Sequence, residues 1–189
     1  MFLNYYLLAF SVYLFWVFIY IFTVKPKDLI WRILYTTVIL CGLISISNIR
    51  INIGLIETLW VIACVISADI GGYSIGRTIG GPKLWPKISP NKTWSGTLGG
   101  WGLAVIITFI FINLTNEIIY TNIFWAVMIA IFAQLGDLAE SALKRSAGIK
   151  DSSNLIPGHG GFLDRFDGMI GAFFLLFILS IINIQQWIF

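Results

Sequence analysis

Charged residues are scarce in this sequence, and cysteine is almost absent. Only 11% of the 189 residues are charged, whereas 58% are hydrophobic, which leaves too little polar surface for a water-soluble globular protein. The two cysteines, Cys41 and Cys64, stand alone inside apolar runs, which excludes a disulfide framework and predicts two small buried side chains. The net charge is only +3, so a nucleic-acid-binding surface is not expected.

Long apolar runs are abundant instead. A helix needs about 20 residues to cross the hydrocarbon core of a bilayer, and six runs approach this length. They predict an all-α, polytopic integral membrane protein with helices over 2–24, 29–47, 53–68, 98–114, 118–135 and 169–184. The third and sixth runs are short, so we expect each helix to continue for a turn or two beyond its cytoplasmic end.

The basic residues predict the orientation of these helices. All but one of the 12 Lys and Arg residues fall on the first, third and fifth connections, and Arg50 is the exception. Because basic residues accumulate on the cytoplasmic side, both termini are expected on the outer side. The third and fifth connections, 69–97 and 136–168, then form two long cytoplasmic loops that hold nearly all the polar residues.

The first of these loops combines glycine with basic residues. Glycines between 71 and 81 would allow positive φ angles, so that backbone N–H groups could converge on an anion. Four basic residues would supply cationic partners for phosphate, namely Arg77, Lys83, Lys87 and Lys92. The alternative is a plain interfacial loop whose basic residues contact anionic lipid.

The second loop begins with carboxylates at helical spacing. Asp137, Glu140, Ser141 and Lys144 are separated by three, four and seven residues from the first, which places them on one face of a helix. Two carboxylates at a membrane boundary are costly unless they are paired or bind a cation. A Glu140–Lys144 ion pair would explain one of them, but it leaves Asp137 unexplained.

The same loop ends with two further carboxylates. Asp164 and Asp167 precede the last apolar run, where they would also suit a helix cap. His159, the single histidine, lies between glycines in the same segment. Hard oxygen ligands beside cationic side chains and glycine loops are typical of magnesium-dependent chemistry on phosphate. The sequence thus predicts an enzyme in which a lipid phosphate reacts with a soluble nucleotide.

Two motifs resemble those of the phosphatidate cytidylyltransferases, also called CDP-diacylglycerol synthases. The longer one covers 141–167 and contains Ser141-Ala-Leu-Lys-Arg, Lys150-Asp151 and Pro157-Gly-His-Gly-Gly-Phe-Leu-Asp-Arg-Phe-Asp. The first loop is similar to that family at Ala68-Asp69, Gly76-Arg77, Ile88-Ser89-Pro90, Lys92-Thr93 and Gly96, but Ile70 and Ser95 depart from its pattern. The resemblance extends over about residues 60–185. It divides the chain into amino-terminal helices (1–50) and a cytidylyltransferase-like membrane domain (51–189).

The resemblance implies that CTP and phosphatidate react to give CDP-diacylglycerol and pyrophosphate, with Mg²⁺ and a possible second metal ion as cofactors. The catalytic residues implied are Asp137, Lys144, His159, Asp164 and Asp167. The metal ligands implied are Asp137, Asp164 and Asp167, with Glu140 and Asp69 as further candidates. Contacts to phosphate or nucleotide are implied for Arg77, Ser89, Lys92, Thr93, Arg145, Lys150, Gly160, Gly161 and Arg165.

Other functions remain open at this point. A CTP-dependent polyprenol kinase would use a similar site, and a non-catalytic scaffold or cation channel would need no substrate. Gly99, Gly100 and Gly102 would let the fourth helix pack closely, which is compatible with a homodimer. The expected location is the bacterial inner membrane, among membrane lipids, with the active site facing the cytoplasm.

Overall fold

Helices make up most of the computed structural model, which describes residues 11–15, 17, 29–115, 120–153, 161, 163–182 and 188. The chain divides into two compact units, Met1–Thr37 and Val38–Phe189. In the first unit, the hydroxyl group of Tyr13 interacts with the hydroxyl group of Thr37 and donates to the carbonyl of Ile33. Every residue of the site described below belongs to the second unit.

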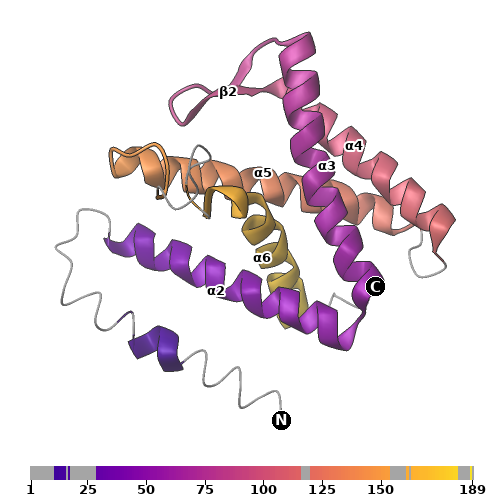
Figure 1. Cartoon of the computed structure of the whole chain (residues 1–189), viewed down its shortest axis with the longest axis horizontal. Coiled ribbons are helices and arrows are strands. Elements are labelled where there is room, and N and C mark those ends of the chain that lie inside the picture. The colour runs from indigo at the N-terminus through magenta and orange to yellow at the C-terminus, as the bar shows by residue number, and fades with distance from the viewer. Residues whose placement is uncertain are drawn as a thin grey trace. The chain divides into compact units, whose positions relative to one another are not determined.

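Four of the described helices are long and apolar enough to cross a membrane (Figure 1). They are α2 (Leu29–Asn52), α3 (Leu55–Ile79), α4 (Trp94–Leu114) and α5 (Asn122–Ser146). A shorter apolar helix, α6 (Asp167–Ile181), follows the 3₁₀ turn η1 (Leu163–Arg165). The second to fifth expected spans are therefore helices, whereas the first, 2–24, falls mostly outside the described residues.

The first polar connection is more helical than expected. α3 continues to Ile79, so that much of 69–97 is helix and not loop, whereas the continuation of α5 to Ser146 agrees with the helical spacing of Asp137 to Lys144. The glycines of α3 explain the difference, since Gly71 and Gly72 lie against α4 at Gly99 and Gly96. They serve close helix packing, and positive φ angles occur in this segment only at Gly80 and Gly81.

A small hairpin interrupts the helices, which corrects the purely all-α expectation. Strands β1 (Lys83–Trp85) and β2 (Ser89–Thr93) pair antiparallel, with Lys83 opposite Thr93 and Trp85 opposite Ser89. β2 runs directly into α4, and the Thr93 side chain caps that helix by accepting a hydrogen bond from the Gly96 N–H at 3.2 Å. The hairpin is thereby fixed to the start of α4.

The core of the second unit lies where α3, α5 and α6 meet. Trp60, Ile129, Phe173 and Leu176 are fully buried there, and the Trp60 indole donates to the Thr108 hydroxyl on α4 at 3.0 Å. Cys64 is buried as expected, whereas Cys41 is half-buried.

α5 and α6 cross at two glycines. A Cβ atom on Gly136 would lie 2.9 Å from the Cα of Gly171, closer than real Cβ contacts allow. Small residues are needed where two helix backbones approach in this way. Because Gly136 precedes Asp137 and Gly171 lies one turn after Asp167, this crossing sets the two carboxylates near each other.

Candidate functional site

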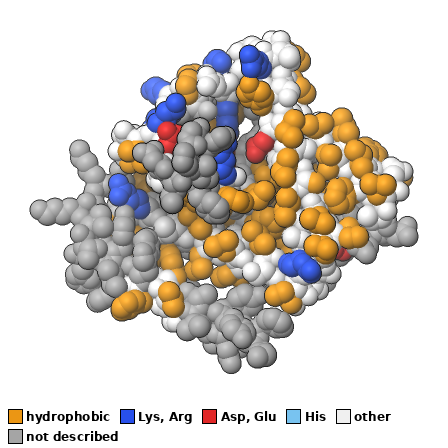
Figure 2. Space-filling model, viewed as in Figure 1, with side chains coloured by type: hydrophobic (Ala, Val, Ile, Leu, Met, Phe, Trp, Pro, Cys, Tyr) orange, Lys and Arg blue, Asp and Glu red, His pale blue; other side chains and the backbone are white. Residues whose placement is uncertain are grey.

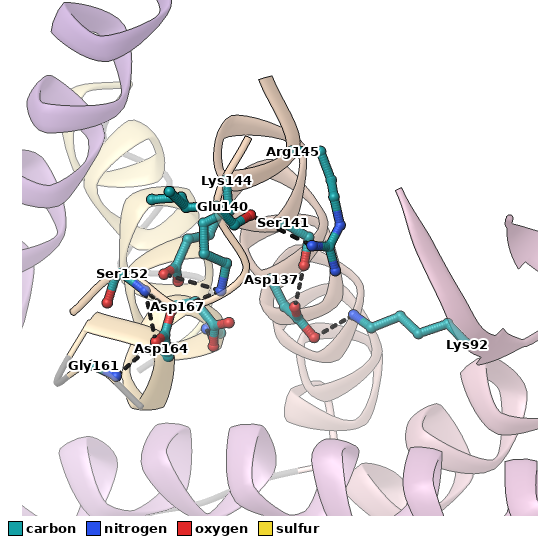
Figure 3. Close-up of polar contacts among 12 residues, drawn as sticks. Lys92, Asp137, Glu140, Ser141, Lys144, Arg145, Ser152, Gly161, Asp164 and Asp167 are labelled. Carbon is teal, nitrogen blue, oxygen red and sulfur yellow. Dashed lines mark hydrogen bonds and ion pairs between the residues drawn. The ribbon is translucent and has the colours of Figure 1, made fainter. Parts of the chain in front are cut away.

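The last three turns of α5 present a polar face. Asp137, Glu140, Ser141 and Lys144 project from it toward residues of the hairpin and of α6 (Figure 3). The helical spacing predicted from the sequence is confirmed. Two clusters of polar contacts form along this face, one centred on Asp137 and the other on Lys144.

The first cluster joins α5 to the hairpin. Lys92 on β2 forms an ion pair with the Oδ2 atom of Asp137, and the Ser141 hydroxyl donates to Oδ1 at 3.3 Å. The side chains of Lys92 and Asp137 are 26% and 30% exposed, so water and solutes can reach this pair. The pair neutralises one carboxylate of the site with a cation from a different part of the sequence.

The second cluster joins α5 to the segment before α6. The Nζ atom of Lys144 lies 2.7 Å from Oδ1 of Asp164 and 3.4 Å from Oε1 of Glu140. Asp164 also accepts hydrogen bonds from the backbone N–H groups of Ser152 and Gly161, which lie 3.0 and 2.8 Å from Oδ2. The Glu140–Lys144 pair considered from the sequence is present, but it is part of this larger cluster.

These contacts fix the charge of Asp164. Burial alone would raise the pKa of this carboxyl group. The hydrogen bonds from Lys144 and the Ser152 N–H outweigh burial and hold the pKa well below its ordinary value. Asp164 is therefore a carboxylate at neutral pH, and it lies in the 3₁₀ turn η1 and not at the N-cap of α6, which is Phe166.

Asp167 is the first residue of α6 and lies in a crowded acidic environment. Burial raises its pKa to about 8, and repulsion from the carboxylate of Asp137 adds to this effect. Glu140 and Asp69 repel Asp167 as well. Four acidic side chains from α3, α5 and α6 thus share one region, where a cation would relieve their mutual repulsion.

The chemistry of these side chains fits a hard cation such as Mg²⁺, which prefers carboxylate oxygens. Among the described residues, the carboxylate oxygens of Glu140 have no hydrogen-bond partner beyond the ion pair with Lys144, although the side chain is only 3% exposed. Within the described residues, no three His, Cys, Asp or Glu side chains stand close enough together to hold a metal ion in this arrangement. The metal ligands named from the sequence therefore remain predictions.

Other residues predicted for the site lie around the two clusters. Arg145, Lys150 and Arg165 are exposed, and Arg145 donates weakly to the carbonyl of Ile149 at 3.4 Å. Ser89 is half-buried in β2, and Arg77 lies near the end of α3. His159 and Gly160 lie outside the described residues.

Sequence reasoning missed Gln134, which lies one helical turn before Asp137. Its amide accepts from the Trp101 indole at 3.0 Å and donates to the Thr97 carbonyl at 3.3 Å. Together with Asp69 and Lys92 it lines a small cavity between α3, α4 and α5. The available signal in the sequence was that Gln134 is a polar residue within an apolar span, three positions before Asp137. Such a residue needs a polar partner.

Comparison with known proteins supports the assignment that the motifs suggested. A profile of the cytidylyltransferase family matches residues 1–182. The phosphatidate cytidylyltransferase of Bacillus subtilis is 46% identical over 127 residues, which are 64% of this chain and 47% of the relative. The enzyme of Brucella suis is 45% identical over 68% of this chain and 48% of the relative. That of Haemophilus influenzae is 43% identical over 67% of this chain and 48% of the relative. The chain spans about half the length of these curated relatives, and it belongs to the cytidylyltransferase family.

Proposed function

We propose that this chain transfers the cytidylyl group of CTP to phosphatidate, giving CDP-diacylglycerol and pyrophosphate. The observation that carries the proposal is the meeting of Asp137, Glu140, Asp164 and Asp167 with Lys92 and Lys144 at one end of α5 and α6. Family membership supports the choice of a cytidine nucleotide, and the names of the relatives support phosphatidate as the acceptor.

The reaction needs no protein nucleophile. A phosphate oxygen of phosphatidate attacks the α-phosphorus of CTP, the bond between the α-phosphorus and the bridging oxygen breaks, and pyrophosphate leaves with that oxygen. The protein's task is then to position two phosphate-bearing substrates and to balance their charge. Lys144 is suited to this task, because the Asp164 carboxylate holds its ammonium group in place while the side chain stays 15% exposed.

A bound Mg²⁺ ion would neutralise phosphate charge and align the triphosphate. Asp137 and Asp167 are the first candidates to hold it, with Glu140 and Asp164 as further ligands and Asp69 nearby. The positive-inside distribution of Lys and Arg supports a site that faces the cytoplasm. For a bacterial chain we propose the inner membrane as the location, since phosphatidate and CTP are both accessible there. A homodimer stays a prediction, although Gly99 and Gly100 already pack within the chain.

The proposal is tested by incubating the purified, detergent-solubilised chain with CTP, Mg²⁺ and phosphatidate and measuring CDP-diacylglycerol by mass spectrometry. We expect product that requires all three components. In the variant Asp164→Asn we expect the rate to fall by about 100-fold or more, which is the cost of removing one electrostatic stabiliser of a transition state. Glu57→Gln is the matched control, because Glu57 lies in the first turn of α3, far along the helix from Asp69.

The result that contradicts the proposal is a folded, monodisperse sample that leaves CTP and phosphatidate intact. In a parallel incubation with CTP, Mg²⁺ and a polyprenol, formation of a simple lipid phosphate would instead identify a CTP-dependent polyprenol kinase. Retained activity in Asp164→Asn would leave the reaction standing but would remove Asp164 from its machinery.

A further inference from the structure

α4 and α5 are joined at the side-chain amide of Gln134, which lies three positions before Asp137 on α5. The Trp101 indole donates to the Oε1 atom of this amide at 3.0 Å, and the amide nitrogen donates to the Thr97 carbonyl at 3.3 Å. Because an indole N–H only donates and a carbonyl only accepts, one orientation of the amide satisfies both partners. Together these two hydrogen bonds form the Gln134 bridge, which fixes α5 to two successive turns of α4.

Gly100 makes room for the Gln134 bridge. A Cβ atom at Gly100 would lie 2.8 Å from the amide nitrogen of Gln134 and 2.6 Å from the carbonyl oxygen of Ala68 on α3, closer than real Cβ atoms come. Three helices therefore meet around this amide. A polar side chain in an apolar span has few other partners, and losing its hydrogen bonds costs free energy. The bridge thus sets the position of α4 along α5.

The first turn of α4 connects the Gln134 bridge to Lys92. The Thr97 hydroxyl donates to the Thr93 carbonyl at 3.1 Å, and the Thr93 hydroxyl accepts from the Gly96 N–H. Thr93 is buried and directly follows Lys92 in β2. A restraint on Thr97 is therefore also a restraint on the backbone of Lys92.

Two links thus join the same two segments of the chain. The Gln134 bridge is neutral, whereas the Lys92–Asp137 ion pair is charged and its side chains are 26% and 30% exposed. Figure 2 shows that Lys and Arg side chains gather at one end of the described face, with acidic side chains close by. An ion pair that water reaches contributes little to holding two segments together, so the bridge is the firmer link.

The ion pair must also open when the site is used. Any ligand that binds the ammonium group of Lys92 or the carboxylate of Asp137 competes with the contact between them. The Gln134 bridge takes part in neither contact and carries no charge, so it stays closed while the ion pair opens.

We infer that Gln134 is a positioning residue, whose bridge to α4 keeps Lys92 and Asp137 facing each other while the ion pair between them opens and closes. The consequence for catalysis rests on the proposed function, whereas the restraint on the hairpin rests on the bridge alone. The two statements are therefore tested separately.

The kinetic test is a double-mutant cycle between Gln134 and Lys92. Gln134→Met keeps the length of the side chain and removes both hydrogen bonds, Lys92→Met removes the charge, and a third variant combines the two changes. The value of kcat/KM for CDP-diacylglycerol formation is measured for each chain, and circular dichroism establishes that each is folded. Asn113→Leu is the matched control, because the Asn113 amide donates to the Phe109 carbonyl of its own helix at 2.7 Å.

We expect Gln134→Met to lower kcat/KM at least about 10-fold and Asn113→Leu to leave it unchanged. In the Lys92→Met background the loss from Gln134→Met should be less than about 3-fold, because the side chain to be positioned is gone. A residue that merely supports the fold would lower kcat/KM by the same factor in both backgrounds. That result, or an unchanged kcat/KM in Gln134→Met, overturns the inference.

Hydrogen exchange measured by mass spectrometry tests the restraint without turnover. The backbone amides of the hairpin, 83–93, should exchange at least about 3-fold faster in Gln134→Met than in the unmodified chain or in Asn113→Leu. Trp101→Phe removes one of the two hydrogen bonds from the α4 side and should speed this exchange to a lesser extent. Unchanged exchange of the hairpin in both variants overturns the inference. Faster exchange in a chain that forms no CDP-diacylglycerol would support the bridge and overturn the proposed function alone.

Discussion

Lys92 on the hairpin and Asp137 on α5 form an ion pair between the two polar segments of the chain. The sequence placed both residues in the site, but it gave no reason to join them. Their pairing joins the hairpin to the carboxylates of the candidate site, so the positions of the two are coupled. It also offers a way to test whether Lys92 serves the reaction or merely offsets charge.

Replacing Lys92 with methionine keeps the length of the side chain and removes its charge. Asp137 then loses its cationic partner. We expect kcat/KM to fall by about 10-fold or more, which corresponds to about 1.4 kcal/mol of transition-state stabilisation. Initial rates of CDP-diacylglycerol formation measure the effect, with Lys87→Met as the control. Equal rates in the two variants would show that Lys92 acts only as a structural counter-ion.

We predict that Gly161 is essential for activity because a side chain does not fit at this position, and not because the backbone needs flexibility there. A Cβ atom there would lie 1.9 Å from the Ser152 hydroxyl oxygen and 2.7 Å from the Ser153 nitrogen. Gly161→Ala must therefore displace the loop that supplies two N–H donors to Asp164. Misplacement of a catalytic group by about 1 Å costs about 100-fold in rate, and we expect a loss of that order.

The matched control is Gly102→Ala, because a Cβ atom at Gly102 meets no atom of the described residues within 4 Å. This variant should keep its activity. If Gly161→Ala were as active as Gly102→Ala, the hydrogen bonds from this loop would not be needed to hold Asp164.

Metal binding is predicted to stabilise the chain in the absence of substrate. Mg²⁺ would relieve the repulsion that Asp167 experiences from Asp137, Glu140 and Asp69. A metal concentration about 100 times the Kd stabilises a folded protein by about 2.7 kcal/mol, so Tm should rise. In Asp167→Asn the Tm without metal should equal or exceed that of the unmodified chain, and the increase with Mg²⁺ should be smaller.

Sodium chloride at matched ionic strength controls for general screening of charge in this experiment. The same Tm increase in Asp167→Asn as in the unmodified chain would exclude Asp167 as a ligand. The readout is the stability of the chain, so it is independent of whether CTP and phosphatidate are turned over.

Much of the site was predictable from local spacing. Asp137, Glu140, Ser141 and Lys144 lie on one helix face, as their separations require. Asp164 in η1 and Asp167 at the start of α6 lie beside them. The pairing of Lys92 with Asp137 was not predictable, because it depends on where the tertiary fold places the hairpin relative to α5. A sequence shows which charges need partners, but not which partner tertiary packing supplies.

The glycines show that local composition can predict the wrong secondary structure. Glycine-rich sequence in 69–97 suggested a loop, whereas α3 continues through Gly71, Gly72 and Gly76. A glycine lowers helix propensity by about 1 kcal/mol, but close packing against α4 outweighs this local preference. Only Gly80 and Gly81, at the end of α3, adopt the positive φ angles that the composition suggested.

The crossing of α5 and α6 yields the last prediction. A Cβ atom on Gly171 would lie 2.2 Å from the Phe132 carbonyl oxygen and 2.8 Å from the Cα of Gly136, so Gly171→Ala must push the helices apart. Overpacking of this kind costs about 1 to 3 kcal/mol, and Tm should fall by about 2 °C or more for each kcal/mol. Because the crossing also sets Asp137 beside Asp167, the variant should lose activity and the Tm increase with Mg²⁺ together. Loss of stability with an unchanged response to Mg²⁺ would show that the crossing supports the fold and not the arrangement of the two carboxylates.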